Sequence, residues 1–276
     1  MAERESRIMV VCRPAAAYFG AGDLARHNLT APADRRRALA QHRRLRAVLA
    51  AAGWDVATLA EPASHPNAVF TRDPVACLRG GFLRLRMGLP SRRGEEEWLA
   101  AELVRLGMEE LGRVEAPGTA EGGDVVPAGR TVFIGRSSRT NAAGARQLRD
   151  ILTHLGHEVR IAPVPPPCLH LGGVMTVIGE GRVLAVTRDL PAGFLDGFDV
   201  VGVPAGSFVS GNVIPLGEGL VLAERTNRAA VEALRAAGVC VRTLDLSEFL
   251  KGTGGPSCLV QPVPAARPFP APRQAH

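Results

Sequence analysis

Four short motifs place reactive side chains where buried strands are expected to begin. Glu121 and Asp124 bracket two glycines in "EGGD", His170 lies in "CLHLGG", Cys258 follows the glycine-rich "GTGGPS", and Asp73 closes "NAVFTRD". A cysteine is a nucleophile only as its thiolate, which a positive neighbour stabilises. A histidine oriented by a carboxylate can serve that cysteine as acid and base. The set is that of a Cys-His-Glu triad, and a further carboxylate favours a cationic substrate.

Each of these signals also has an ordinary structural interpretation. A single cysteine is most often a small buried apolar residue, and we expect this of Cys12, Cys77, Cys168 and Cys240. Cys258 differs because a glycine-rich loop presents it. A histidine before a strand is commonly structural, Asp73 followed by proline could start a turn, and "EGGD" could mark a hairpin. The motifs carry chemistry only if the fold brings them together.

A recurring pattern of elements supplies a way to do so. A helix, a glycine and a short apolar strand follow one another in residues 37–59, 140–164 and 226–246, and more loosely in 94–117. Each helix ends at glycine, the residue that tolerates the left-handed position after a helix. Paired apolar runs joined by a glycine-containing turn precede or follow these units, in residues 75–88, 123–135, 172–186 and 211–224.

The repeating unit is therefore strand, turn, strand, helix, strand. Such units bury their apolar faces only against their neighbours. Four or five of them, one divided between the N-terminus and the later chain, predict an α/β propeller of ββαβ modules closed around an axis. An open α/β sheet is the alternative. Residues 186–203 leave room for a short helix at most. In a closed ring, equivalent strand ends converge on the axis, and the four motifs meet there.

The composition fits this architecture. Of the 276 residues, 46% are hydrophobic and only 4% aromatic, which predicts an aliphatic core of layered α/β type. We expect residues 1–263 to form a single catalytic domain. The proline-rich residues 264–276 are expected to form a disordered tail.

Charge, cysteine usage and hydropathy narrow the class of protein. The net charge of +6 comes almost wholly from arginine, spread along the chain, and nucleic-acid motifs are absent, so we expect no nucleic-acid partner. Five irregularly spaced cysteines without CxxC argue against disulfides or structural zinc. Neither a signal peptide nor a membrane-spanning run is apparent, so we expect a cytoplasmic protein without membrane contact.

Taken together and in order, the motifs resemble those of a known family. The matching segments are "VFTRDP", "SRRGEEE", "APGTAEGGD", "IGRSSRTN", "CLHL", "GN" and "SEFLKGTGGPSC". This order is similar to that of the guanidino-group modifying enzymes, which include dimethylarginine dimethylaminohydrolases, arginine deiminases and amidinotransferases. The first group is the most similar, and the resemblance extends from about Val10 to Val263. It implies a five-module α/β propeller with a central active site.

The resemblance also implies roles for individual residues. Cys258 matches the nucleophile, His170 the general acid and base, and Glu121 the acid that orients the histidine and touches the guanidinium. Asp73 matches the carboxylate that clamps the guanidinium nitrogens, and Asp124 supports the site. Arg86 and Arg139 match the arginines that bind the substrate carboxylate. The implied reaction passes through a covalent thiouronium and needs neither a metal nor an organic cofactor.

Three departures bear on the substrate. Members that act on methylated arginine usually carry "D-x-V-F-x-E-D", whereas Asn67 here replaces the aspartate that contacts the substrate α-amine, and Arg72 replaces the glutamate. "LHLGG" replaces the usual "LHLK", and "FTRD" also occurs in arginine deiminases. Length favours the compact hydrolase over the longer deiminases and amidinotransferases.

Three hypotheses follow. The first is hydrolysis of Nω-methylated arginine to citrulline and a methylamine. The second is hydrolysis of arginine or another guanidino compound. The third is a catalytically silent propeller used for binding, which the intact set of four motifs disfavours. We expect a small-molecule guanidino substrate as the partner, and a homodimer as a candidate assembly.

Overall fold

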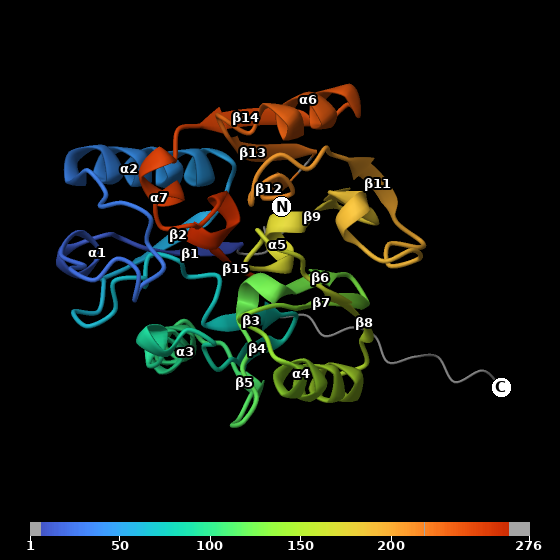
Figure 1. Cartoon of the computed structure of the whole chain (residues 1–276), viewed down its shortest axis with the longest axis horizontal. Helices are drawn as coiled ribbons and strands as arrows, with labels where there is room; N and C mark the ends of the chain where they lie inside the picture. The colour runs from blue at the N-terminus through green and yellow to red at the C-terminus, as the bar shows by residue number, and fades with distance from the viewer. Residues whose placement is uncertain (1–6, 218, 265–276) are drawn as a thin grey trace, which may run out of the picture.

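A computed structural model describes residues 7–217 and 219–264, so all but the first residue of the expected tail lies outside the described residues. These residues form five separate three-stranded sheets around a common centre (Figure 1). In each sheet the middle strand pairs antiparallel with one neighbour and parallel with the other. The prediction of a five-module α/β propeller is confirmed.

The five modules follow one another along the chain. From the antiparallel to the parallel edge, the sheets are β15 (Gln261–Val263), β1 (Ile8–Cys12) and β2 (Asp55–Leu59); β3 (Val75–Leu78), β4 (Gly81–Arg84) and β5 (Glu110–Arg113); β6 (Val125–Ala128), β7 (Thr131–Arg136) and β8 (Glu158–Pro163); β9 (Met175–Gly179), β10 (Arg182–Ala185) and β11 (Asp199–Gly202); β12 (Val213–Gly217), β13 (Leu220–Glu224) and β14 (Cys240–Leu244).

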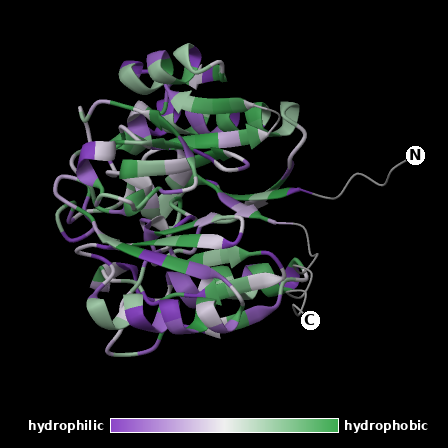
Figure 2. Ribbon diagram, turned by 90° about the vertical axis from the view of Figure 1, so that its right-hand side faces the viewer, coloured by the Kyte–Doolittle hydropathy of each residue, from purple (hydrophilic) through white to green (hydrophobic). Residues whose placement is uncertain are grey.

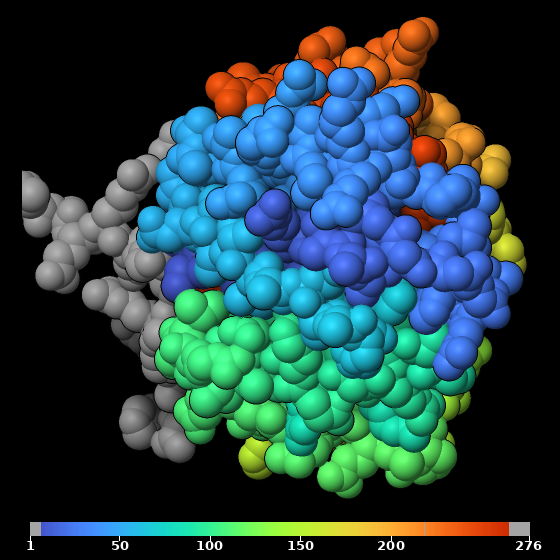
Figure 3. Space-filling model, turned by 90° about the vertical axis from the view of Figure 1, so that its left-hand side faces the viewer, coloured from blue at the N-terminus to red at the C-terminus, as the bar shows by residue number. Residues whose placement is uncertain are grey.

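The first module closes the ring, because its strands come from both ends of the described chain. Strand β15 pairs antiparallel with β1, with Ile8 opposite Val263, and β1 pairs parallel with β2. This is the divided unit that the sequence predicts. Figure 3 shows the N-terminal segments in blue lying between the C-terminal segments in orange and the second and third modules in green.

Helices on the outside connect the parallel strands of four modules. They are α2 (Arg35–Ala51), α3 (Glu95–Arg105), α4 (Ala142–His154) and α6 (Arg228–Ala236). Side chains of Asp34, Asn141 and Asn227 accept hydrogen bonds from the backbone N–H groups of the first turns of α2, α4 and α6, which fixes where these helices begin. The glycines that follow the four helices are left-handed, with φ of +83° at Gly53 and +86° at Gly156, for example.

The remaining helical segments are short. They are α1 (Ala16–Phe19), α5 (Leu171–Val174) and α7 (Ser247–Leu250), with single 3₁₀ turns at Pro90–Arg92, Gly122–Asp124, Thr187–Asp189 and Pro256–Leu259. The fourth module thus crosses from β10 to β11 with only a 3₁₀ turn. This agrees with the little room that residues 186–203 were expected to offer.

Apolar side chains pack between neighbouring modules. One cluster joins Val10 and Val263 of the first module to Val75, Phe82 and Leu103 of the second. Another joins the second module to the third, and two larger clusters complete the ring. Figure 2 shows the apolar residues concentrated along the strands and the polar ones on the outer helices. Each module therefore depends on its neighbours, as repeat logic requires. Among the described residues, no helix has the length and hydropathy to cross a membrane.

Two adjacent residues of α3 test this packing. Leu103 is fully buried against the second module, whereas Val104 is 56% exposed. We expect Leu103→Ala to lower the free energy of unfolding by about 2–5 kcal/mol, since it removes buried methyl groups and leaves a cavity. Val104→Ala, the matched control, should change it by no more than about 0.5 kcal/mol. Urea unfolding followed by circular dichroism measures both, and equal effects would contradict this account of the core.

Candidate active site

The four motifs converge because each precedes the innermost strand of a different module. Asp73 lies just before β3, and Glu121 just before the 3₁₀ turn that leads into β6. His170 precedes α5 and β9, and Cys258 lies in the 3₁₀ turn before β15. These four side chains line one small cavity together with Asn67 and other residues. The arrangement is the convergence of strand ends that a closed ring predicts.

Glycines permit this approach. A Cβ atom on Gly123 would lie 2.7 Å from Cγ of His170 and 2.9 Å from Oδ1 of Asp73. Both distances are far below normal van der Waals separation, so a side chain here would push the histidine or the aspartate away. The second glycine of "EGGD" is therefore required by the meeting of three chain segments, and the motif is more than a hairpin turn.

His170 and Glu121 form the central pair. Nε2 of the imidazole lies 2.8 Å from Oε2 of the fully buried carboxylate, and Nδ1 lies 3.9 Å from Oδ1 of Asp73. Burial disfavours the charged imidazole, but Asp73, the hydrogen bond to Glu121 and the charge of Asp124 overcome it and raise the pKa of His170 to about 9. The imidazole is thus protonated at neutral pH.

Glu121 is held as an anion by several donors. Burial alone would raise its pKa, yet the bond to His170 and the charges of His170, Arg92 and Arg139 lower the pKa of Glu121 to about 2. Oε1 also accepts hydrogen bonds from the backbone N–H groups of Gly88 at 3.0 Å and Leu89 at 3.2 Å. A carboxylate fixed in this way can hold the histidine in one orientation.

Arg92 enters the site although the sequence analysis gave it no role. Its Nη1 donates to Oδ2 of Asp73 at 2.6 Å, and its Nη2 donates to Oε2 of Glu95 at 2.7 Å. All three side chains are buried. The available signal was its place in "SRRGEEE", one of the segments that carry the family resemblance.

Arg139 and Arg86, the two arginines expected at the substrate carboxylate, lie in different places. Arg139 lines the small cavity, with Nη1 3.6 Å from Oε1 of Glu121. Arg86 donates to the carbonyl oxygen of Gly118 and is not among the cavity-lining residues. The structure thus brings Arg92 and Arg139, rather than Arg86, to the site.

Two acceptors in the site have no hydrogen-bond partner among the described residues. They are Oδ1 of Asp73 and Oδ1 of Asn67, and both are buried. The Asn67 amide nitrogen donates to the carbonyl of His27 at 3.0 Å, which leaves its oxygen as the group available to a ligand. Buried acceptors without partners are costly, so both mark places where a donor is expected to bind.

Asp124 supports the site from behind and lines neither of the two cavities at the centre of the ring. Its carboxylate accepts from the hydroxyls of Ser137 at 2.6 Å and Thr140 at 2.7 Å, and from the backbone N–H of Leu171 at 2.8 Å. Leu171 directly follows His170. Asp124 therefore anchors the backbone that carries the histidine.

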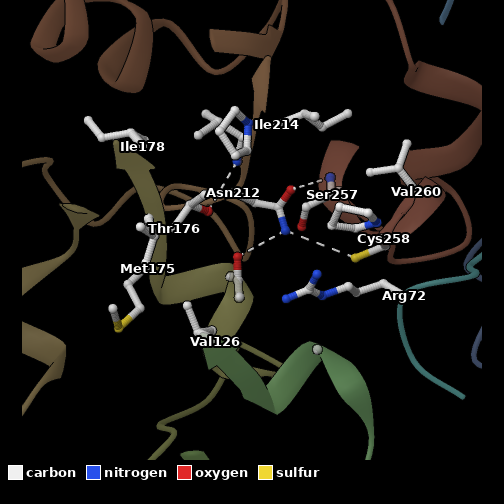
Figure 4. Close-up of a pocket in the computed structure, with 18 of the residues that line it drawn as sticks. Arg72, Val126, Met175, Thr176, Ile178, Asn212, Ile214, Ser257, Cys258 and Val260 are labelled. Carbon is white, nitrogen blue, oxygen red and sulfur yellow. Dashed lines mark hydrogen bonds between the residues drawn. The ribbon is translucent and has the colours of Figure 1, made fainter. Parts of the chain in front are cut away.

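Cys258 is partly buried and faces the site from the last strand. Burial and the negative charge of Asp73 raise the pKa of its thiol to about 12, against the opposing charges of Arg72 and Arg92. Nδ2 of Asn212 lies 4.0 Å from Sγ and donates to the carbonyl of Gly172 at 2.9 Å (Figure 4). Without a bound cation the sulfur is therefore a neutral thiol at neutral pH.

Ligand atoms of Asp73, Glu121 and His170 lie within 4.8 Å of one another, a spacing that could hold a metal ion. However, the guanidinium of Arg92 already pairs with Asp73, and that of Arg139 lies beside Glu121. A metal ion would meet these two fixed positive charges. The residues thus fit a planar organic cation better than a metal, and a metal-free reaction stays a prediction.

Comparison with known proteins agrees with this geometry. Residues 20–189 match the family model of arginine deiminase. A dimethylarginine dimethylaminohydrolase of Pseudomonas aeruginosa is 32% identical over 82% of this chain and 88% of its own length. The chain belongs to the arginine deiminase family. A second dimethylarginine dimethylaminohydrolase, from Streptomyces coelicolor, is 34% identical over 76% of this chain and 80% of its own.

A solved structure supports the same relationship within the family. It is the Pseudomonas aeruginosa dimethylarginine dimethylaminohydrolase, a cysteine-to-serine variant complexed with citrulline, with a TM-score of 0.81 and 29% identity. The similarity covers 94% of this chain and 100% of that one. The family inferred from the ordered motifs is confirmed, and the chain is a hydrolase of the guanidino-group class.

The His170–Glu121 pair can be tested by titration. We expect NMR of the histidine ring to give a pKa near 9 for His170, assigned by loss of the signal in His170→Asn. Glu121→Gln removes a charge and weakens the hydrogen bond, so the pKa should fall by about one unit or more. Because the folded pKa is raised above the ordinary 6.5, the pair stabilises the fold fully below pH 6.5, and this contribution disappears as pH rises through about 9. An unchanged pKa in the variant would contradict the pairing.

The anchoring role of Asp124 gives a second test. In Asp124→Asn an amide NH₂ replaces one carboxylate oxygen and faces a hydroxyl or N–H donor. We expect the free energy of unfolding to fall by about 1–3 kcal/mol, with a shift of the His170 ring signals. Asp150→Asn is the matched control, since Asp150 is exposed and pairs only with neighbouring Arg149. A loss no larger than that of the control would show that Asp124 anchors nothing.

Proposed function

We propose that the protein hydrolyses the guanidino group of Nω-methylated arginine to citrulline and a methylamine. The observation that carries the proposal is the convergence of Cys258, His170, Glu121 and Asp73 on one small cavity, with a protonated histidine 2.8 Å from a buried carboxylate. A nucleophile, an acid and carboxylates for a planar cation are the groups that this reaction requires.

Substrate binding follows from the unsatisfied groups. Oδ1 of Asp73 accepts from the guanidinium nitrogens, alongside Glu121. The substrate carboxylate lies toward Arg139 and Arg92, the two cations on the cavity wall, and Oδ1 of Asn67 accepts from the α-ammonium group. An amide oxygen is a weaker partner for an ammonium than a carboxylate, so we expect the α-amino group to contribute little to binding.

The chemistry then proceeds in two halves. The bound cation stabilises the thiolate of Cys258, whose proton leaves to solvent, and the sulfur attacks the central guanidinium carbon. His170 gives its proton to the departing amine as the carbon–nitrogen bond breaks, which leaves a thiouronium on the sulfur. The neutral imidazole then takes a proton from water as the oxygen attacks the same carbon. The carbon–sulfur bond breaks, the second proton of water restores the thiol, and citrulline leaves.

Hydrolysis of arginine itself is the second candidate. The observation that favours it is the charge pattern beside Asp73, where Asn67 and Arg72 stand in place of two acids usual in methylarginine hydrolases and "FTRD" matches arginine deiminases. The two candidates use the same catalytic groups. They differ only in whether the departing nitrogen carries methyl groups.

A product assay separates the two candidates. We expect the protein to release citrulline and dimethylamine from asymmetric dimethylarginine faster than citrulline and ammonia from arginine. Agmatine lacks the carboxylate, so its kcat/KM should be lower by about 10²-fold or more through the lost charged hydrogen bonds. Chromatography of the ureido and amine products measures all three. Turnover of arginine alone would replace the first candidate with the second.

The nucleophile requires its own control. Cys258→Ser should lower kcat by at least about 10³-fold, because serine lacks a base placed to deprotonate it. Cys168→Ser serves as the matched control, since Cys168 lies two residues from His170 and has a thiol without a role in the reaction. Full activity of Cys258→Ser would overturn the mechanism. A homodimeric state and a cytoplasmic location stay predictions.

A further inference from the structure

Cys258 separates two cavities that share a wall. The small one contains Asp73, Glu121, Arg92 and Arg139. A much larger one, of about 440 Å³, follows the axis of the ring and is lined mainly by apolar residues of the inner strands. Cys258 and His170 line both, together with Leu169 and Thr253. The nucleophile therefore has a second face, away from the site that binds the guanidinium.

Arg72 brings a positive charge to this second face. Its backbone N–H donates to the carbonyl of Cys258 at 3.2 Å, so the two residues are adjacent across the ring. Its guanidinium projects into the larger cavity below the Cys258 sulfur (Figure 4). Position 72 is also where the chain departs from the glutamate usual in methylarginine hydrolases, so the sign of the charge is reversed.

The charge of Arg72 is not neutralised locally. Its side chain donates through Nη2 to the carbonyl of Val125 at 3.0 Å, and among the described residues no carboxylate lies within 4.0 Å of it. By contrast, Arg92 pairs with both Asp73 and Glu95. Arg72 is therefore the cation near Cys258 whose field is least cancelled, and it acts through a cavity where water screens it less than bulk solvent would.

The sulfur thus lies between charges of opposite sign. Asp73 on the side of the small cavity opposes the thiolate, and Arg72 on the side of the large cavity favours it. A bound substrate neutralises Asp73 but leaves Arg72 unchanged. We propose that Arg72 is an electrostatic positioning residue that stabilises the Cys258 thiolate from the larger cavity.

The test is the pH dependence of Cys258 alkylation by iodoacetamide in the substrate-free protein, quantified by mass spectrometry of the Cys258 peptide. We expect Arg72→Gln to slow alkylation at pH 7 about 10-fold, which corresponds to one unit in the thiol pKa. Arg72→Glu should slow it further, to about 100-fold. Arg72→Lys, which keeps the charge, should remain within about 3-fold of the original protein.

Controls separate charge from structure. Arg7 lines the same cavity but stacks on Trp54 and donates to Leu216, so Arg7→Gln should leave the Cys258 profile unchanged. An unchanged profile in Arg72→Gln, an equal shift in Arg7→Gln, or failure of folded Arg72→Lys to retain the profile would each overturn the proposal. Circular dichroism identifies the variants that fold. This inference deepens the proposed function but needs no substrate, so it can fail or succeed independently of the product assay.

Discussion

Burial of carboxylates at the centre of a ring is the constraint on which the rest of this structure depends. Asp73, Glu121 and Asp124 are all nearly or fully inaccessible to solvent. A buried carboxylate is tolerated only with donors or cations around it. Each of the three has a different solution: Arg92 for Asp73, His170 with two backbone N–H groups for Glu121, and two hydroxyls with a backbone N–H for Asp124.

These solutions divide the acids by function. Asp124 has its oxygens engaged by fixed donors, so it can only hold the backbone beside His170. Glu121 couples the histidine to the loop at Gly88 and Leu89, which transmits one orientation to the acid and base. Asp73 alone keeps an oxygen without a partner. The same motif type, an acid before a buried strand, therefore yields an anchor, an orienter and a ligand-binding group.

Much of this organisation was predictable because it is local in sequence. Helix, glycine and strand recur within short segments, so the modules and even the divided first module could be predicted from pattern. The catalytic motifs were found because each lies at the start of an inner strand. Arg92 was missed because its partner Asp73 is 19 residues away along the chain, and only the folded ring determines which of many arginines meets it. Arg86 was chosen on spacing in "FLRLRMG", but the isolated bridge between Arg86 and Ala120 directs it to Gly118 instead.

The two ends of the small cavity are specified to different degrees, and this bears on evolution of substrate choice. At the guanidinium end, His170 meets two buried acids, and Gly123 leaves no room for change. At the other end, Asn67 presents a neutral oxygen, and its amide nitrogen is already bound to the loop at His27. Asn67 and Arg72 belong to the segment that ends at Asp73, so a few substitutions there alter recognition without moving the triad. The family chemistry is fixed by the strand ends, and the substrate is set by the segment that precedes one of them.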